Sequence, residues 1–383
     1  MRYQKLKGIW KFFLLAIIVV SFIIIFILYI SPMDKKASSK VTFNYSVQHH
    51  YEKEWDFDNG EMVENKNDRK NNIESEQSNT AFINVSVATL WSEPNKLRSI
   101  DRYSATNPVD PWKWTKSMSV DDKLWLVGKT ETQALYGQSV TILEEKDDWV
   151  KVAVHGQPTP KSDIGYVGWM LKEQIVKDST FTYDENLLAI VTDPTTWLFH
   201  DQGLHSSFLE VSYNTRLPII AQLDGVTLVL TPSDGYKWIS SKSISVTHLE
   251  QEIKSPTGED LVTTAKLFLG LPYVWAGTSG FGFDCSGFTY TIYKAHGITI
   301  PRDSSVQAIQ GIPVKKEDLQ KGDLLFFANN NGKGFVHHVG MYIGKGEMIH
   351  APNSATPVEI IKVFESSYWS SEFAGARRYI SIE

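Results

Sequence analysis

The stretch "GFGFDCSGFTY" at residues 280–290 contains the only cysteine in a chain of 383 residues. Residues 284–297 show a pattern that predicts a helix ending at Gly297, which places Cys285 in its first turn. Backbone N–H groups and the helix dipole favour a thiolate there, and a thiolate is the reactive form. A lone cysteine is more often a small buried side chain than a nucleophile, so the catalytic interpretation requires a base.

The stretch "HHVGMYIG" at 337–344 offers His337 and His338 as that base. Neighbouring strand residues point to opposite faces of a sheet, so only one of them can meet the thiol. The turn "GKGE" predicts a hairpin of 336–344 with 348–352. In that hairpin His350 lies diagonal to His338, with Cα atoms roughly 7–8 Å apart. We therefore interpret His338 as the base and His350 as the group that orients it.

The rest of the C-terminal region predicts an α+β domain over residues 249–383. The stretch "SPTGEDLVTTAKLFLG" (255–270) is typical of a helix that begins with a capping box between Thr257 and Asp260. Three later stretches have the pattern of strands: "GDLLFFA", "HHVGMYIGKGEMIHAP" and "AGARRYISIE". Helices followed by an antiparallel sheet favour the α+β class.

Residues 81–248 read as two consecutive sets of short strands broken by Asp, Gly and Pro. Each set opens with a strand and a Trp and closes on a Gly-Tyr…Trp element, "GYVGW" at 165–169 and "GYKWI" at 235–239. This internal repeat predicts two small barrels, at 81–176 and 177–248.

The N-terminal 30 residues predict a membrane anchor. Residues 12–30 are apolar except for Ser21, and as a helix they span roughly 28 Å, the thickness of a bilayer core. The basic residues before them favour a cytoplasmic N-terminus and an extracellular remainder, a single-pass protein of the cell membrane. The alternative is a cleaved signal peptide and a secreted protein. Residues 31–80 are polar and predict a flexible linker.

Composition excludes several other classes. A net charge of −6 and a pI near 6.0 argue against nucleic acid as a partner. One cysteine excludes an intrachain disulfide and a cysteine-rich zinc site, and nothing in the sequence implies a metal or an organic cofactor.

Six stretches in the last 135 residues together resemble the NlpC/P60 cysteine peptidases, which have a papain-like fold. They are "YVWAG" (273–277), "DCSGF" (284–288), "IPRDSS" (300–305), "KGDLLFF" (321–327), "HHVGMYIG" (337–344) and "MIHAP" (348–352). The resemblance implies that Cys285 is the nucleophile, His338 the base and His350 the third catalytic residue.

Two SH3-like barrels before such a domain resemble the γ-D-glutamyl-L-diamino-acid endopeptidases, which cut peptidoglycan stem peptides with a free N-terminal L-Ala. That resemblance implies substrate contacts by Asp284, Ser286, Asp303 and Ser304. It also implies a first-barrel tyrosine, Tyr136 in "TQALYG", and a first-barrel acid. For the acid, Asp101 in "LRSIDR" fits better than Glu93 in "WSEP". Tyr273 and Trp275 are candidates to line the cleft.

The expected protein is thus a membrane-tethered thiol hydrolase that acts on muropeptides. Two alternatives stay open: an amidase or acyltransferase on the same fold, or a wall-peptide binding module with an inert last domain. The sequence does not choose between lysine and diaminopimelate, or between intact wall and released fragments.

Overall fold

The computed structural model describes residues 53–56, 61–64, 79–177, 180–183, 187–248 and 255–380. The predicted anchor at 12–30 lies outside the described residues. No helix within the described ranges is long and apolar enough to cross a membrane. The chain divides into two compact units, Met1–Glu74 and Ser75–Glu383. In the first unit, a short antiparallel hairpin of β1 (Lys53–Asp56) and β2 (Glu61–Glu64) lies within the segment predicted as linker.

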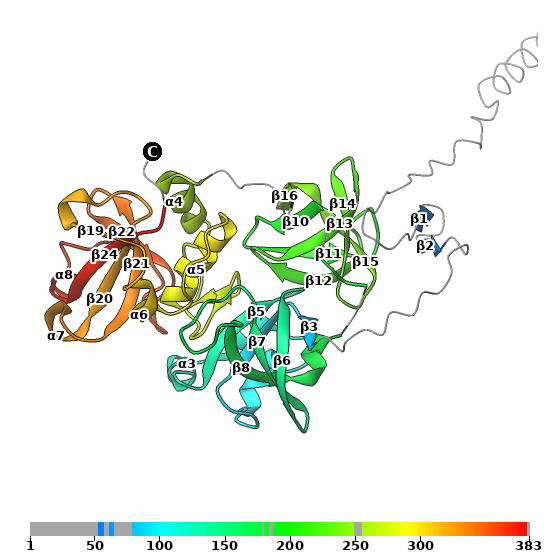
Figure 1. The fold of residues 1–383 in the computed structure, drawn as a ribbon, viewed down its shortest axis with the longest axis horizontal. Coiled ribbons are helices and arrows are strands. Elements are labelled where there is room, and N and C mark those ends of the chain that lie inside the picture. Colours follow the sequence, from blue (N-terminus) through cyan, green and yellow to red (C-terminus); the bar gives the residue numbers. More distant parts are fainter. Residues whose placement is uncertain are drawn as a thin grey trace, which may run out of the picture. The chain divides into compact units, whose positions relative to one another are not determined.

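The first barrel of the second unit is a seven-stranded antiparallel sheet with the order β5-β4-β8-β7-β6-β3-β9 (Figure 1). Its strands are β3 (Thr80–Ile83), β4 (Val87–Trp91), β5 (Thr130–Leu135), β6 (Ser139–Lys146), β7 (Trp149–Val154), β8 (Tyr166–Leu171) and β9 (Ile175–Val176), with the 3₁₀ turn η2 (Lys172–Gln174) before β9. Aliphatic side chains that alternate along the strands, such as Val140, Ile142 and Val152, fill the core, as the alternation in the sequence predicts.

A helical insertion separates β4 from β5, where the sequence analysis anticipated only strands. It comprises η1 (Ser99–Ser104), α2 (Pro111–Ser117) and α3 (Val120–Trp125). Local sequence explains both α-helices: Asp110 caps α2 with a proline in the next position, and Ser119 forms a capping box at the start of α3. The insertion covers a second core of the barrel, which is rich in tryptophan and includes Trp91 and Trp114.

The second barrel repeats the first strand for strand. Its strands are β10 (Leu187–Val191), β11 (Thr195–Phe199), β12 (Ser207–Ser212), β13 (Arg216–Leu223), β14 (Val226–Leu230), β15 (Tyr236–Ser240) and β16 (Ile244–His248), with η3 (Ser241–Ser243) before β16. Their order, β12-β11-β15-β14-β13-β10-β16, matches that of the first barrel position by position. The two predicted SH3-like modules are therefore present.

The last region is the predicted α+β domain. Its elements are α4 (Gly258–Lys266), β17 (Thr278–Ser279), β18 (Gly282–Phe283), α5 (Cys285–Ala295), α6 (Ser304–Gln307), β19 (Ile312–Val314), η4 (Lys316–Asp318), β20 (Leu324–Ala328), α7 (Asn329–Gly332), β21 (Val336–Gly344), β22 (Glu347–His350), β23 (Glu359–Lys362), α8 (Ser367–Glu372) and β24 (Phe373–Arg378). Six strands form one sheet in the order β19-β24-β20-β21-β22-β23.

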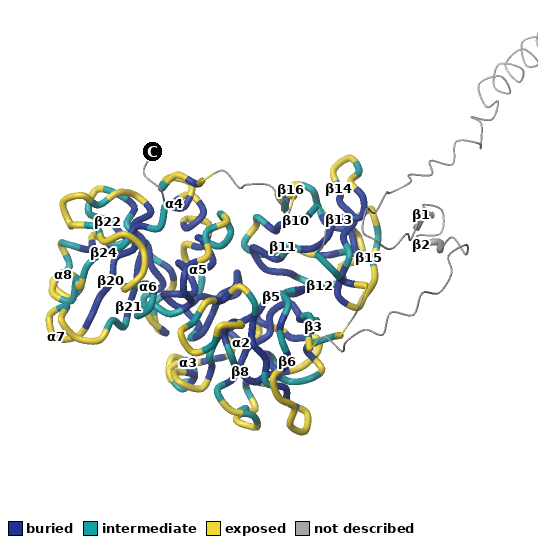
Figure 2. Tube along the Cα trace, in the orientation of Figure 1, coloured by how far each residue is buried: buried dark blue, intermediate teal, exposed yellow. Residues whose placement is uncertain are grey.

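Helix α5 packs on this sheet and places the candidate nucleophile beside β21, an interior strand. Phe288 and Ile292 of α5 share one apolar core with Val339 and Met341 of β21. Figure 2 shows the strands and α5 largely buried, with exposed residues concentrated in the turns. The helix therefore has one fixed position relative to β21, the strand that carries the candidate base.

Candidate active site

Cys285 is the first residue of α5 and is 8% exposed. The helix begins here because the Asp284 carboxylate accepts a hydrogen bond from the Gly287 N–H at 2.6 Å and caps the first turn. The thiol lies close to the backbone N–H groups of Ser286 and Val339. Val339 directly follows His338, so the cysteine faces the strand that carries both candidate bases.

The Cys285 thiol is protonated in the resting protein, contrary to the expectation of a thiolate. Burial, together with the neighbouring Asp284 carboxylate, raises the pKa of the thiol to about 12 and outweighs the backbone hydrogen bonds that lower it. The proton must therefore leave as the sulfur attacks, which makes a nearby base necessary.

The hairpin of β21 and β22 brings His338 and His350 together, as the turn prediction expects. Met341 pairs with Ile349 and Tyr342 with Met348, so the register continues to Gly340 opposite His350. Nε2 of His338 lies 2.8 Å from Nδ1 of His350. The arrangement leaves Nδ1 of His338 as the ring nitrogen that can serve the thiol.

Both imidazoles are neutral. Burial lowers the pKa of His350 to about 3, and burial with the two neighbouring histidines lowers the pKa of His338 well below its usual value. The indole of Trp369 in α8 packs against both rings, with centroids 4.7 Å from His338 and 5.1 Å from His350. This cover limits the access of water and restricts ring rotation.

His337 takes no part in this pair. Its Nε2 lies 3.0 Å from a carboxylate oxygen of Glu372, and its side chain is 29% exposed. The alternation of side chains along β21 thus places His338 in the site and His337 in contact with Glu372, which agrees with the choice made from the hairpin.

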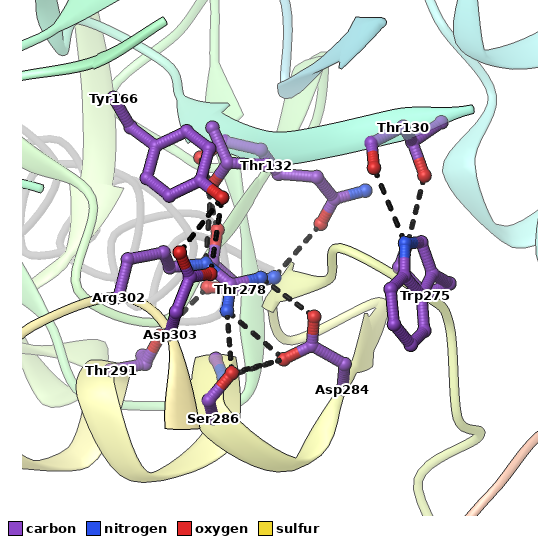
Figure 3. Close-up of polar contacts among 12 residues, drawn as sticks. Thr130, Thr132, Tyr166, Trp275, Thr278, Asp284, Ser286, Thr291, Arg302 and Asp303 are labelled. Atoms are coloured by element: carbon purple, nitrogen blue, oxygen red, sulfur yellow. Dashed lines mark hydrogen bonds and ion pairs between the residues drawn. The ribbon is translucent and has the colours of Figure 1, made fainter. Parts of the chain in front are cut away.

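Arg302 joins the start of α5 to the first barrel (Figure 3). Its guanidinium is 1% exposed and donates to both carboxylate oxygens of Asp284, at 3.1 and 2.8 Å, and to Oγ of Ser286 at 3.0 Å. Its Nε donates to the Thr132 hydroxyl of β5 at 3.2 Å. Asp284 and Ser286, predicted to contact substrate, flank Cys285, and both bind Arg302, which the sequence analysis did not single out.

A second contact between the domains joins Tyr166 of β8 to Asp303. The Tyr166 hydroxyl lies 3.1 Å from each carboxylate oxygen of Asp303 (Figure 3). Burial and the charge of Asp303 raise the pKa of this tyrosine, and Glu131 of β5 lies close enough to raise it further. The first barrel therefore contributes Tyr166 and Glu131 to the surroundings of Asp303, not the tyrosine and the acid predicted from the sequence.

The structure places Tyr136 and Asp101 elsewhere. Tyr136 is buried in the core of the second barrel, with its hydroxyl 3.4 Å from Asp234. Asp101 is fully buried in the helical insertion, where Arg98 binds both of its oxygens at 2.9 Å and the Trp114 indole N–H donates at 3.0 Å. Each side chain is already satisfied by its own barrel, or by the interface between the barrels, so neither is directed to Cys285.

Of the remaining candidates, some lie near Cys285 and others do not. Glu93 is a surface residue that pairs with Lys96. Tyr273 is buried in the same apolar cluster as Cys285, and burial is the main cause that raises its pKa well above the usual value. Trp275 packs at the junction with the first barrel, with its indole N–H 3.2 Å from the Thr130 carbonyl. Ser304 is the first residue of α6, directly after Asp303.

The signals for the missed residues were present in the sequence. Arg302 is part of the quoted "IPRDSS", and Tyr166 is part of the quoted repeat "GYVGW". Local sequence patterns do not reveal their roles, which arise from contacts between segments more than 130 residues apart. Within the described ranges, no group of three or more His, Cys, Asp or Glu side chains is placed to hold a metal ion.

A buried thiol at a helix N-terminus, facing a strand hairpin whose two strands each carry one imidazole of a hydrogen-bonded pair, defines the site of a cysteine peptidase. The sequence profile of the NlpC/P60 family matches residues 270–378, and that of the YKFC SH3b2 domain matches residues 191–246. The chain belongs to the NlpC/P60 family and is a cysteine peptidase with SH3b-like domains, as its motifs predict.

Two curated relatives match along most of their length. A γ-D-glutamyl-L-lysine dipeptidyl-peptidase of Bacillus cereus is 54% identical over 80% of this chain and 93% of its own length. An enzyme of the same name from Bacillus subtilis is 38% identical over 77% of this chain and 97% of its own. The crystal structure of an NlpC/P60 family protein from Bacillus cereus, 54% identical, covers 79% of this chain and 100% of its own with a TM-score of 0.76.

Proposed function

We propose that this protein hydrolyses the bond between γ-D-glutamate and the diamino acid in peptidoglycan stem peptides whose N-terminal L-Ala is free. The reaction releases the dipeptide L-Ala-D-Glu. The names of the two relatives support the bond. The surroundings of Asp303, described below, support the requirement for a free amine.

In the proposed mechanism Cys285 attacks the γ-carbonyl of D-glutamate. The thiol has a pKa of about 12, so its proton passes to Nδ1 of His338 as the carbon–sulfur bond forms. His350 accepts a hydrogen bond from Nε2 of His338 and stabilises the imidazolium. The backbone amides in the first turn of α5 stabilise the oxyanion.

The second half of the mechanism uses the same groups in reverse. His338 returns the proton to the leaving amine of the diamino acid. This leaves the acyl-enzyme, in which His338 is again neutral and can act as a base. The base then activates a water molecule, which hydrolyses the thioester and frees Cys285.

The charge around Asp303 favours a substrate ammonium. Three carboxylates lie in this region, those of Asp284, Asp303 and Glu131, against two cations, Arg302 and Lys161. One carboxylate is therefore in excess, and the ammonium of L-Ala would neutralise it. An acylated amine has no charge and leaves that carboxylate unpaired, so the site discriminates against it.

The test is a comparison of two peptides, L-Ala-γ-D-Glu-L-Lys and its N-acetyl form. We expect the free peptide to yield L-Ala-D-Glu and lysine by mass spectrometry, and the acetylated peptide to react at least about 100-fold more slowly. Cys285→Ala serves as the control and abolishes both reactions. Equal rates for the two peptides would refute the amine requirement, and a different cleaved bond would favour an amidase or acyltransferase. A diaminopimelate peptide in the same assay decides between the two diamino acids.

We also propose that residues 12–30 anchor the enzyme in the cell membrane with the catalytic domain outside. The apolar length and the basic flank of this segment support the proposal. Deletion of residues 1–30 should move the protein from the membrane fraction to the soluble fraction. A shortened wild-type chain in the culture medium would instead indicate a cleaved signal peptide.

A further inference from the structure

One nitrogen of the catalytic histidine pair has no hydrogen-bond partner. His350 is fully buried, and its Nδ1 is occupied by His338 at 2.8 Å. Among the described residues, its Nε2 is one of only two buried side-chain polar atoms without a hydrogen bond. Such an atom costs about 1–3 kcal/mol when left unsatisfied, so its surroundings are informative.

The carboxylate of Glu359 lies next to this nitrogen. Glu359 stands directly opposite His350 in the register of β22 and β23, and its Oε1 is 3.6 Å from Nε2 of His350. The strand β23 is at the edge of the sheet, and the Glu359 side chain is 40% exposed. A small rotation of this side chain closes the gap to the 2.7–3.2 Å of a hydrogen bond.

The chemistry of the pair requires a proton on that nitrogen. For His338 to accept the thiol proton at Nδ1, its own proton must reside on Nε2 and point at Nδ1 of His350. His350 then accepts at Nδ1, and because it is neutral its single proton resides on Nε2. This proton points at Glu359, and only an acceptor there holds the correct tautomer of both rings.

We propose that Glu359 is a positioning residue, the fourth member of a chain formed by Cys285, His338, His350 and Glu359. The proposal rests on the mechanism proposed above. The carboxylate acts through His350: it selects the tautomer that leaves His338 able to accept a proton, and it stabilises the imidazolium that forms during attack. An amide in its place can donate to Nε2 and hold the opposite tautomer, in which His338 carries its proton on the nitrogen that faces the thiol.

The kinetic test compares Glu359→Gln with a matched variant, Glu347→Gln. Glu347 lies at the other end of the same strand pair, opposite Lys362. We expect Glu359→Gln to lower kcat about 10- to 100-fold with KM within about twofold, since a group that acts on the imidazolium contributes in the transition state. Glu347→Gln should retain the wild-type kcat, and Glu359→Asp should recover part of the activity. Equal loss in both Gln variants, or none in Glu359→Gln, overturns the proposal.

A second measurement is independent of activity. In the full-length protein with ¹⁵N-labelled histidine, long-range ¹H–¹⁵N correlation reports which ring nitrogen of His350 carries the proton. We expect the proton on Nε2 in the wild type and a shift to Nδ1 in Glu359→Gln. A proton on Nδ1 in the wild type would overturn the proposal. A wild type with no hydrolysis but with the expected tautomers would instead refute the proposed function and leave the tautomer assignment standing.

Discussion

The two barrels have the same strand order but meet the catalytic domain at different places. The first barrel contacts the N-terminal end of α5, through Thr132 with Arg302 and through Tyr166 with Asp303. The second barrel contacts the C-terminal end, where Arg216 donates to the Lys294 carbonyl at 3.1 Å, and the turn before α5, where the Gly280 N–H donates to Oγ of Ser212 at 2.8 Å. Cys285 lies at the N-terminal end of α5, and the side chains that bind Arg302 and Asp303 near it come from the first barrel. A repeated fold therefore does not imply a repeated role.

A difference of one residue between the two repeats accounts for part of this difference in how the barrels contact the catalytic domain. Tyr166 and Trp169 are three residues apart in β8, whereas Tyr236 and Trp238 are two apart in β15. In a strand, residues two apart share a face and residues three apart do not. Trp169 pairs with β4 and Trp238 pairs with β11, and these two strands occupy equivalent positions in the two barrels. The additional residue, Gly168, therefore places Tyr166 on the face opposite to its tryptophan.

The largest expected effect is that of Arg302→Met, which breaks the first-barrel contact. The change leaves the buried Asp284 carboxylate without its partner, so we expect a loss of about 3–5 kcal/mol in the free energy of unfolding by urea. Movement at the start of α5 should lower kcat/KM at least about 100-fold. Arg216→Met is the matched change at the second barrel, and it should leave kcat/KM within about threefold. Similar losses of kcat/KM in the two variants would contradict the expectation that the first-barrel contact matters more for activity.

Asp101→Asn tests whether the insertion of the first barrel is structural or binds substrate. The carboxylate binds Arg98 and the Trp114 indole in a buried site, so its loss should lower the free energy of unfolding by about 2–3 kcal/mol. We expect KM for the tripeptide to stay within about twofold of the wild type. Glu93→Gln, at the exposed acid nearby, should change neither quantity. A tenfold rise in KM for Asp101→Asn would restore the role predicted from the sequence.

Tyr166→Phe isolates the hydroxyl that reaches Asp303. Removing this hydrogen bond should lower kcat/KM about tenfold, which corresponds to about 1.4 kcal/mol. Tyr236→Phe is the control at the equivalent position of the second barrel and should remain within about twofold of the wild type. If Tyr166→Phe has the same kcat/KM as the wild type for the free-amine peptide, the expected difference between the two barrels is wrong.

The smallest expected effect is that of Tyr136→Phe. Its hydroxyl is 3.4 Å from Asp234, a long hydrogen bond, and the ring keeps its place in the second-barrel core. The free energy of unfolding should fall by less than about 1 kcal/mol, with kcat/KM unchanged. A clear fall in kcat/KM with no change in stability would mean that Tyr136 acts at the site after all.

The pairing of His338 with His350 could be predicted because its geometry is local. The turn between β21 and β22 sets the register that brings His338 and His350 together. The helix that carries Cys285 starts at a capping aspartate next to it in the sequence. The helical insertion of the first barrel also carries local capping signals, at Asp110 and Ser119. Its helices were not predicted because the segment lies between two stretches with the pattern of strands.

The sequence by itself therefore determined the repeat, the α+β domain and the hairpin that pairs His338 with His350, because periodicity, capping and turn geometry act over a few residues. Only the tertiary structure decided that Tyr166 of the first barrel meets Asp303, a contact across 137 positions, and that Tyr136 lies in the core of the second barrel. It also decided that the thiol is protonated at rest and that Glu359 lies beside His350. These properties depend on burial and on which strands become neighbours, and both are set by the packing of the whole chain.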